Sequence, residues 1–277
     1  MLTRIFAGAM LAGLWVHAAA DDVSRYVRFT DGTDASYGER VGEVIHQLDG
    51  APWANGTRTG LTVKAGDVQL LAPAEPSKVF AVGFNFDSHL AGQTLPAYPP
   101  IFLKLPTSIA GPGAEIIYPA GATNVHFEGE LVVVIGKTAS RVTADSAGDY
   151  IFGVTAGNDV SGRDWQANDL QWFRAKASDT FGPIGPEIVT GVNYRDLLLQ
   201  TRLNGKVVQE QRTRDHIHDV HAIVSFISQY ATLYPGDVIF TGTPGQTSEM
   251  MPGDRIEIEI EDIGILTNTV GKPITSN

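Results

Sequence analysis

Short apolar runs separated by turns follow the first twenty residues of the chain. Extended segments are expected at four places: 25–29, 42–48, 61–63 and 68–71. Asp31-Gly32 and Asp49-Gly50 supply turn residues between them. The pattern predicts a small β-rich N-terminal module over 21–76, which ends in a stiff proline-containing link at 73–76.

Strands also dominate the rest of the chain. Apolar strands are predicted at 78–83 and 101–105, and strands continue from there to Val270. A helical period appears at 218–230, where apolar residues recur at three- and four-residue spacing. We therefore predict an α+β, β-rich fold with one main domain over 77–277.

The run at 256–261 alternates isoleucine and glutamate without exception. Its three glutamates resemble a carboxylate cluster. Strict alternation is what a half-buried strand shows, so we expect the isoleucines in the core and the glutamates in solvent.

Residues 1–20 have the three parts of a secretory signal peptide. Arg4 precedes an apolar run at 5–16, and three alanines at 18–20 provide a small-residue cleavage site. The apolar run is too short to span a bilayer. We expect an exported protein, periplasmic or secreted, with no membrane association after cleavage. The alternative is an uncleaved short anchor.

Charge and cysteine content narrow the possible partners. The formal net charge is −11, and loss of Arg4 with the signal peptide takes it to −12. Nucleic acid as a partner is therefore not expected, because phosphate binding needs a basic face. The chain has no cysteine, which excludes disulfides and thiolate chemistry.

The segment FEGELVVVIG at 127–136 carries the main candidate site. Side chains alternate faces along a strand, so Glu128 and Glu130 point the same way. Asp159 follows a second apolar run and is expected at a neighbouring strand end. Oxygen ligands without cysteine or histidine favour Mg²⁺, Mn²⁺ or Ca²⁺. The alternative places both glutamates on the wet face of an edge strand.

Other polar groups offer supporting chemistry. Lys176 lies in a turn-rich segment and would neutralise an enolate if held near a metal, or would be an ordinary surface lysine. Arg163 and Asp164 follow a strand and have the alternative of pairing with each other. The glycine loop at 241–245 lacks the lysine of a nucleotide-binding loop, but Thr243 and its amides suit a small carboxylate.

Three histidines lie close together before and within the predicted helix: His216, His218 and His221. They have no acidic partner at metal-ligand spacing. We interpret them as a surface cluster at the helix start.

Six motifs in order resemble the fumarylacetoacetate hydrolase family. They cover almost the whole chain after the signal peptide: NFDSH at 85–89, FEGEL at 127–131, NDVSGRD at 158–164, KASDTF at 176–181, NG at 204–205, and PGD at 235–237 leading to TGTP at 241–244. The resemblance favours the metal interpretation of Glu128 and Glu130 over the edge-strand interpretation.

The resemblance implies a catalytic domain of rolled mixed β-sheets, a homodimer, and Mg²⁺ or Mn²⁺ held by Glu128, Glu130 and Asp159. Such enzymes act on 2-oxo acids with a further carbonyl by carbon–carbon hydrolysis, decarboxylation, isomerisation or hydration, through a metal-bound enolate. Lys176 and Gln166 match positions that touch the substrate or enolate, and Thr243 matches the substrate-binding loop. Arg163 is a further substrate-binding candidate.

His89 matches the histidine that activates water in family hydrolases, but its usual partner is missing. Those enzymes often carry a glutamate three positions later, where this chain has Gly92. A histidine without that carboxylate loses an orienting hydrogen bond and some basicity. Either another acid such as Asp87 assists His89, or the chemistry needs no activated water.

Two classes of function follow. The first is an exported metal-dependent hydrolase of a small acylpyruvate-like oxo-acid, with decarboxylation or isomerisation as alternatives and His89 and Lys176 as catalytic residues. The second is an exported protein that binds a metal and an oxo-acid with little turnover. The long proline-bounded loop at 89–100 suits a lid in the first case.

Overall fold

The computed structural model describes residues 23–90, 92–94 and 97–274. The predicted signal peptide at 1–20 lies outside the described residues. Within these described ranges, no helix has the length and apolar character needed to cross a membrane.

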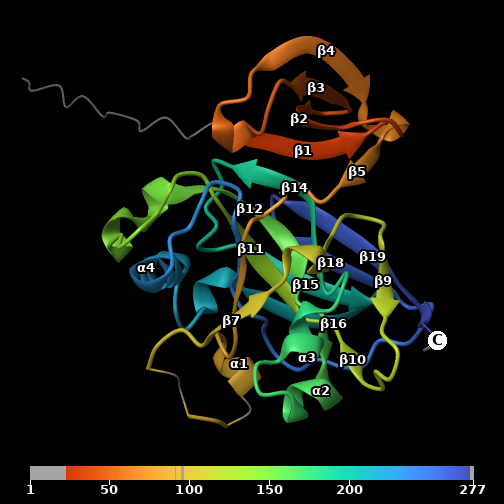
Figure 1. Ribbon diagram of the computed structural model, residues 1–277, viewed down its shortest axis with the longest axis vertical. Coiled ribbons are helices and arrows are strands. Elements are labelled where there is room, and N and C mark those ends of the chain that lie inside the picture. Colours follow the sequence, from red (N-terminus) through yellow and green to blue (C-terminus); the bar gives the residue numbers. More distant parts are fainter. Residues whose placement is uncertain (1–22, 91, 95–96, 275–277) are drawn as a thin grey trace, which may run out of the picture.

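The N-terminal module is an antiparallel set of strands, drawn in red and orange at one end of the molecule (Figure 1). Its strands are β1 (Ser24–Thr30), β2 (Ala35–Val41), β3 (Val44–Leu48), β4 (Arg58–Lys64) and β5 (Gln69–Leu71). Four of them overlap the predicted extended runs. The sequence pattern did not predict β2, whose residues are mostly half-buried or exposed.

The module is continuous with the large sheet of the main domain, because β1 pairs with β14. The 12-stranded sheet has the order β4-β3-β2-β1-β14-β12-β11-β17-β6-β7, with β5 and β8 beside this path. The strands outside the module are β6 (Val79–Val82), β7 (Ile101–Lys104), β8 (Ile109–Ala110), β11 (Gly129–Ile135), β12 (Ile151–Asn158), β14 (Gly182–Thr190) and β17 (Val238–Phe240). The pairs β17·β6 and β14·β8 are parallel and the others antiparallel, which confirms the predicted mixed sheet.

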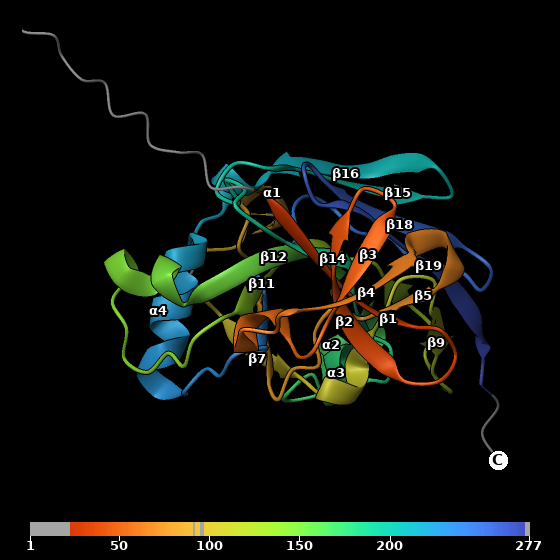
Figure 2. The same ribbon diagram turned by 90° about the horizontal axis from the view of Figure 1, so that it is seen from above.

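A second sheet packs against the first (Figure 2). Its five strands have the order β16-β15-β18-β19-β9. They are β9 (Glu115–Tyr118), β15 (Leu198–Leu203), β16 (Lys206–Arg212), β18 (Arg255–Ile260) and β19 (Gly264–Pro273). The isoleucines of β18 lie in the core as predicted, and Glu259 and Glu261 form ion pairs nearer the surface. Glu257 differs from the expectation, since it is buried beside Arg255.

Strand β11 is buried on both faces, which explains its continuous apolar sequence. Leu131 and Val133 face the second sheet. Val132 and Val134 face a second core beneath Trp53 of the N-terminal module. Because Glu130 shares the parity of Val132, its carboxylate is directed away from the second sheet.

The helices are few and mostly short. They are α1 (Asp87–Leu90), α2 (Arg163–Asn168), α3 (Phe173–Ala177) and α4 (Val220–Tyr230), and the 3₁₀ helices are Pro52–Ala54, Ala65–Asp67, Pro106–Ser108, Ala144–Tyr150 and Thr213–Asp215. The predicted helix is confirmed as α4, which buries Val220, Ile223 and Ile227. Helices α1, α2 and α3 gather at the end away from the N-terminal module (Figure 1).

Candidate active site

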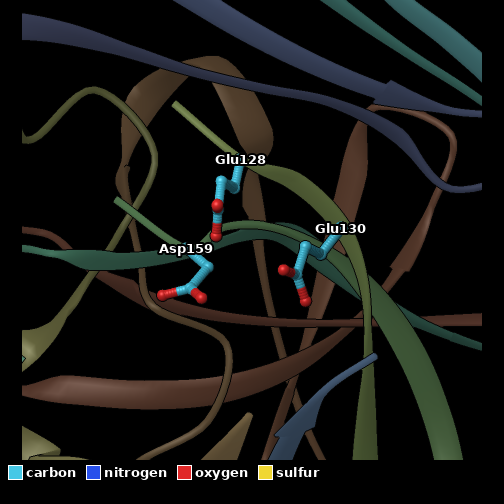
Figure 3. Close-up of side chains that lie close together, drawn as sticks. All are labelled: Glu128, Glu130 and Asp159. Carbon is cyan, nitrogen blue, oxygen red and sulfur yellow. The ribbon is translucent and has the colours of Figure 1, made fainter. Parts of the chain in front are cut away.

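Three carboxylates converge where β11 begins and β12 ends. Gly129 of β11 pairs with Asn158 of β12, so Glu128 and Asp159 flank this register and Glu130 lies one residue further along. One oxygen from each of Glu128, Glu130 and Asp159 lies within 4.8 Å of the others, and all three side chains are buried (Figure 3). This spacing permits one shared coordination shell, and Glu128 and Glu130 are not on a wet strand face.

Gly129 allows the backbone between the two glutamates to lie close against the second sheet. A Cβ at this position would lie 2.1 Å from Thr201 Oγ1 and 3.1 Å from Ile258 Cδ1. The amide of Glu128 donates to Asn158 Oδ1 at 2.9 Å, and the amide of Asp159 donates to the Glu128 carbonyl at 2.8 Å. The carboxylates are therefore fixed by backbone as well as by packing.

Two buried lysines balance the acidic cluster. Lys176 Nζ lies 2.5 Å from Glu128 Oε2 and 2.6 Å from Asp159 Oδ2. Lys176 belongs to α3 and is 2% exposed, so it is not a surface lysine. Lys104 Nζ lies 2.5 Å from Asp159 Oδ1 and also donates to the Lys176 carbonyl. Sequence reasoning missed Lys104, since a lysine that ends an apolar strand such as IFLK is usually exposed.

The pKa values of the two glutamates are shifted in opposite directions. Burial, together with the negative charges of Asp159 and Glu128, raises the pKa of Glu130 well above its ordinary value. Burial opposes ionisation of Glu128 too, but the positive charges of Lys176 and Arg163 outweigh it and lower the pKa of Glu128. Burial lowers the pKa of Lys104 despite the attraction of Asp159. Glu130 is thus the carboxylate with the least cationic compensation.

The donor set fits a hard divalent cation. Three buried carboxylates offer oxygen ligands only, which suits Mg²⁺, Mn²⁺ or Ca²⁺ rather than zinc. No second group of three acidic or histidine ligands occurs in the described part of the chain. The histidines near α4 are not part of this ligand group. His216 packs on Phe86, and His221 contacts the Tyr194 hydroxyl at 2.9 Å.

His89 lies in α1 at the edge of this cluster. Its Nδ1 is 2.6 Å from the Gly245 carbonyl oxygen, and its Nε2 is 3.8 Å from Glu128 Oε1. A carbonyl only accepts hydrogen bonds, so Nδ1 carries the proton of the neutral ring and Nε2 keeps its lone pair. The Gly245 carbonyl thus takes the orienting role of the missing glutamate. No hydrogen bond or ion pair joins Asp87 to His89 in the described residues.

Gly92 occupies the position expected for that glutamate, and its backbone explains the absence. It has φ +84, in the left-handed region that disfavours a glutamate. The local chain therefore favours glycine over a carboxylate residue there.

Arg163 and Gln166 extend from α2 toward the same cluster. Arg163 Nη2 donates to Glu128 Oε1 at 2.5 Å, and Nη1 donates to Gln166 Oε1 at 2.6 Å. Arg163 does not pair with Asp164, which accepts from Thr123 at 3.0 Å. These side-chain oxygens help to fix the guanidinium at the cavity.

Thr243 is buried behind the metal-ligand strand. Its hydroxyl donates to the Gly129 carbonyl at 2.9 Å and accepts from Gln209 Nε2 at 2.8 Å. In the same loop, the Gly242 amide donates to Glu130 Oε2 at 2.6 Å. The loop thereby sets the position of Glu130. Gln209 was not predicted, since nothing in its strand marks it as functional.

A cavity of about 300 Å³ opens over these groups. Its polar lining consists of His89, Glu128, Glu130, Arg163, Gln166, Lys176 and Thr243. Its apolar lining includes Phe84, Phe102 and Trp172. Every predicted site residue except Asp159 therefore lines one cavity, and Asp159 contacts Lys176 beneath it.

Comparisons with known proteins agree with this architecture. The family model described as fumarylacetoacetate (FAA) hydrolase C-terminal matches residues 78–271, and one described as Rv2993c-like, N-terminal, matches 24–73. Protein Rv2993c of Mycobacterium tuberculosis is 48% identical over 248 residues, 87% of this chain and 94% of its own length.

Two further relatives are named for an enzymatic activity. An oxaloacetate tautomerase of human mitochondria is 39% identical over 219 residues, 74% of this chain and 70% of its own. The crystal structure of a 2-hydroxyhepta-2,4-diene-1,7-dioate isomerase from Mycobacterium marinum has a TM-score of 0.85 and 44% identity, covering 91% of this chain and all of that one. The family model spans most of the chain and several relatives exceed 30% identity, so this protein belongs to the fumarylacetoacetate hydrolase family.

Proposed function

We propose that this protein is a divalent-metal-dependent enzyme that moves a proton within a small 2-oxo dicarboxylic acid, as a tautomerase or isomerase. The observation that carries the proposal is the environment of His89. Its Nδ1 is bound to a carbonyl oxygen rather than to a carboxylate, which orients the ring and leaves Nε2 as the proton acceptor at the cavity. The names of the related human tautomerase and the mycobacterial isomerase support the same reaction class.

The cation expected at Glu128, Glu130 and Asp159 is Mg²⁺ or Mn²⁺, with Ca²⁺ also compatible. When bound, it supplies Lewis acidity toward a 2-oxo carboxylate. The charges of the side chains support a dianionic substrate. Three carboxylates face three cationic groups, Lys104, Lys176 and Arg163, so a divalent ion leaves two positive charges in excess.

The protein's side chains transfer the proton, stabilise the developing charge and orient the substrate. His89 Nε2 removes a proton from the carbon next to the 2-oxo group and returns it to oxygen or to another carbon. The Lys176 ammonium stabilises the negative charge that develops meanwhile. Gln166, Arg163 and the Thr243 loop orient the substrate. The Phe84, Phe102 and Trp172 side chains limit water around the proton in transit.

Carbon–carbon hydrolysis of an acylpyruvate-like acid is the second candidate. It has the support of the family whose model matches the chain. Hydrolysis needs an activated water, and in the described residues the partner at His89 Nδ1 is a carbonyl oxygen, with Gly92 at the position where a carboxylate is expected. The third possibility, a binding protein with little turnover, keeps the same metal and substrate contacts.

The test uses purified protein loaded with Mg²⁺. We expect the enol form of oxaloacetate to be consumed, as followed by its ultraviolet absorbance, while a panel of acylpyruvates is hydrolysed slowly or not at all. EDTA should abolish activity, and added Mg²⁺ or Mn²⁺ should restore it. Faster acylpyruvate cleavage would favour the hydrolase, and ligand-induced thermal stabilisation without turnover would favour the binding protein.

Variants separate the roles within the site. Glu128→Gln keeps the size of the side chain but removes a ligand charge, so both metal binding and turnover should fall at least a hundredfold. His89→Gln should keep metal binding and lose turnover by about 10²- to 10⁴-fold. Retention of metal affinity and activity in Glu128→Gln would refute the metal-site assignment.

We also propose that the enzyme is exported and acts as a homodimer. Export predicts an N-terminus at Asp21 in material from the periplasm or medium, which N-terminal sequencing measures. For the dimer, the supporting feature is an apolar face at the free edge of β7, which ends the large sheet. Leu103, Leu170 and Phe173 are 60%, 93% and 62% exposed there.

This β7 face carries both parts of a self-complementary contact. Leu170 is one of the residues that line a groove of about 520 Å³, together with Leu103 and Phe173, and the lining has no charged side chain. A second copy related by a two-fold axis would place each Leu170 in the other's groove. Sedimentation should show a dimer that Leu170→Asp converts to a monomer. A monomeric wild type would overturn this proposal without affecting the proposed reaction.

A further inference from the structure

A chain of hydrogen bonds continues from Arg163 away from the carboxylates. Arg163 Nη2 donates to Thr247 Oγ1 at 2.8 Å, and Thr247 Oγ1 lies 2.9 Å from His126 Nδ1. His126 Nε2 lies 2.7 Å from Asn124 Oδ1. We propose that His126 and Thr247 are positioning residues that hold the Arg163 guanidinium to receive the second carboxylate of a dicarboxylate substrate. This inference rests on the proposed function.

The hydrogen-bond partners determine which atom is the donor in each of these hydrogen bonds. The Asn124 Oδ1 atom only accepts, so His126 Nε2 is the donor and Nδ1 of the neutral ring is the acceptor. Arg163 only donates, so Thr247 accepts from it and gives its own hydroxyl proton to His126. One arrangement of protons therefore satisfies all four groups, and it points the acceptor lone pair of Thr247 at the guanidinium.

The backbone around this chain is held on two sides. His126 pairs with Ser161 across the short strands β10 (Val125–His126) and β13 (Ser161–Gly162), and the Arg163 amide donates to the Asn124 carbonyl at 2.9 Å. On the other side, His126 forms a β-bridge with Glu249. The backbone that carries Asn124, His126 and Arg163 is thus fixed. The side-chain rotamer of Arg163 then decides where its guanidinium lies.

The rotamer matters because the guanidinium of Arg163 is held by the side-chain oxygens of Glu128, Gln166 and Thr247. It is a long side chain, 20% exposed, and shares its Nη2 between Glu128 and Thr247. Without the Thr247 hydroxyl, the guanidinium keeps Glu128 and Gln166 as partners but loses one of its two Nη2 acceptors. The remaining N–H groups on Nη1 and Nε are then aimed less firmly at a carboxylate, which weakens its binding.

The expected signature is selectivity between ligands. Pyruvate has one carboxylate, which belongs at the cation, so its binding should not depend on Thr247. 2-Oxoglutarate has a second carboxylate for Arg163. Thr247→Val, which removes the hydroxyl at constant volume, should weaken 2-oxoglutarate binding about tenfold and leave pyruvate binding within about twofold. Thr247→Ser, the matched control, should bind both ligands like the wild type.

Calorimetry on the Mg²⁺-loaded protein measures both ligands without requiring turnover. His126→Gln should resemble Thr247→Val, and Thr247→Val should cause no further loss in an Arg163→Met background. Equal weakening of both ligands, or additive losses in the double variant, would overturn the positioning role. If neither ligand binds the wild type while the thermal transition is intact, the proposed function itself fails, and the inference with it.

Discussion

At the scale of single residues, Gly129 shows how closely the site is built into the core. A Cβ there would meet the Thr201 hydroxyl oxygen at 2.1 Å, in a strand that is buried on both sides. Gly129→Ala should therefore lower the free energy of unfolding by about 1–3 kcal/mol and reduce metal affinity, because β11 must shift. Gly66→Ala is the matched control, since a Cβ at Gly66 meets nothing within 4 Å. Denaturant unfolding measures both, and equal stabilities would contradict this account.

A second residue links stability to pH. Burial lowers the pKa of His216 to about 4, against nearby acidic groups that favour its charged form. The unfolded chain binds the proton near pH 6.5, so folding loses stability as pH falls from about 6.5 toward 4. The loss should reach at most about 3 kcal/mol at the lower end of that window.

His216→Asn, which does not titrate, should flatten this part of the stability curve. The measurement is the midpoint of chemical denaturation at half-unit steps between pH 4 and 7, with His46→Asn as the control. An identical acid slope in His216→Asn and wild type would rule out His216 as the source.

At the scale of elements, the sequence predicts what depends on long periodic runs. The helix at α4 follows from apolar periodicity, and the strands β6, β7, β11 and β12 follow from continuous apolar runs. The order of the family motifs indicated which acidic residues meet. The short helices α2 and α3 could not be predicted in this way. They have too few residues for a period, and they are held by tertiary contacts such as the bond from Arg163 to Glu128.

Lys104 illustrates the same limit within the site. Its strand shows only that a lysine ends an apolar run, whereas its role depends on a carboxylate 55 positions later in the chain. Likewise, no sequence pattern predicts that the Gly245 carbonyl contacts His89, because that contact joins helix α1 to a loop 156 positions later in the chain. Pairings of this kind are set by sheet order, which a single sequence does not specify.

The start of α4 provides a prediction at this scale. The Asp219 side chain accepts a hydrogen bond from the Ala222 amide at 2.8 Å and so caps the helix. Asp219→Ala should lower the free energy of unfolding by about 1 kcal/mol, whereas Asp219→Ser should retain most of the cap. Thermal denaturation distinguishes the two. Equal losses in both variants would indicate that the ion pair with Arg195, rather than the cap, provides the stability.

At the scale of the whole molecule, the N-terminal module and the main domain share a sheet and an ion-pair network. Glu187 of β14 is buried and lies 2.6 Å from Arg25 and 3.7 Å from Arg40, both in the module. Arg25 also donates to the Ile263 carbonyl at 3.1 Å, so one cluster ties together the module, the large sheet and the turn before β19.

Removal of Glu187 would leave two arginines without their shared partner at this junction. Glu187→Ala should lower the free energy of unfolding by about 1–2 kcal/mol, because the pair is only half-buried and the arginines left behind, 34% and 28% exposed, reach solvent. The control is Glu75→Ala, whose carboxylate pairs with Arg28 but is 62% exposed and should cost less than about 1 kcal/mol. Glu187 does not line the candidate cavity, so the oxaloacetate assay should change little in either variant. Calorimetry then shows how the module and the main domain unfold. A single transition that moves to lower temperature in Glu187→Ala means that they form one cooperative unit. A separate early transition means that the module unfolds before the main domain.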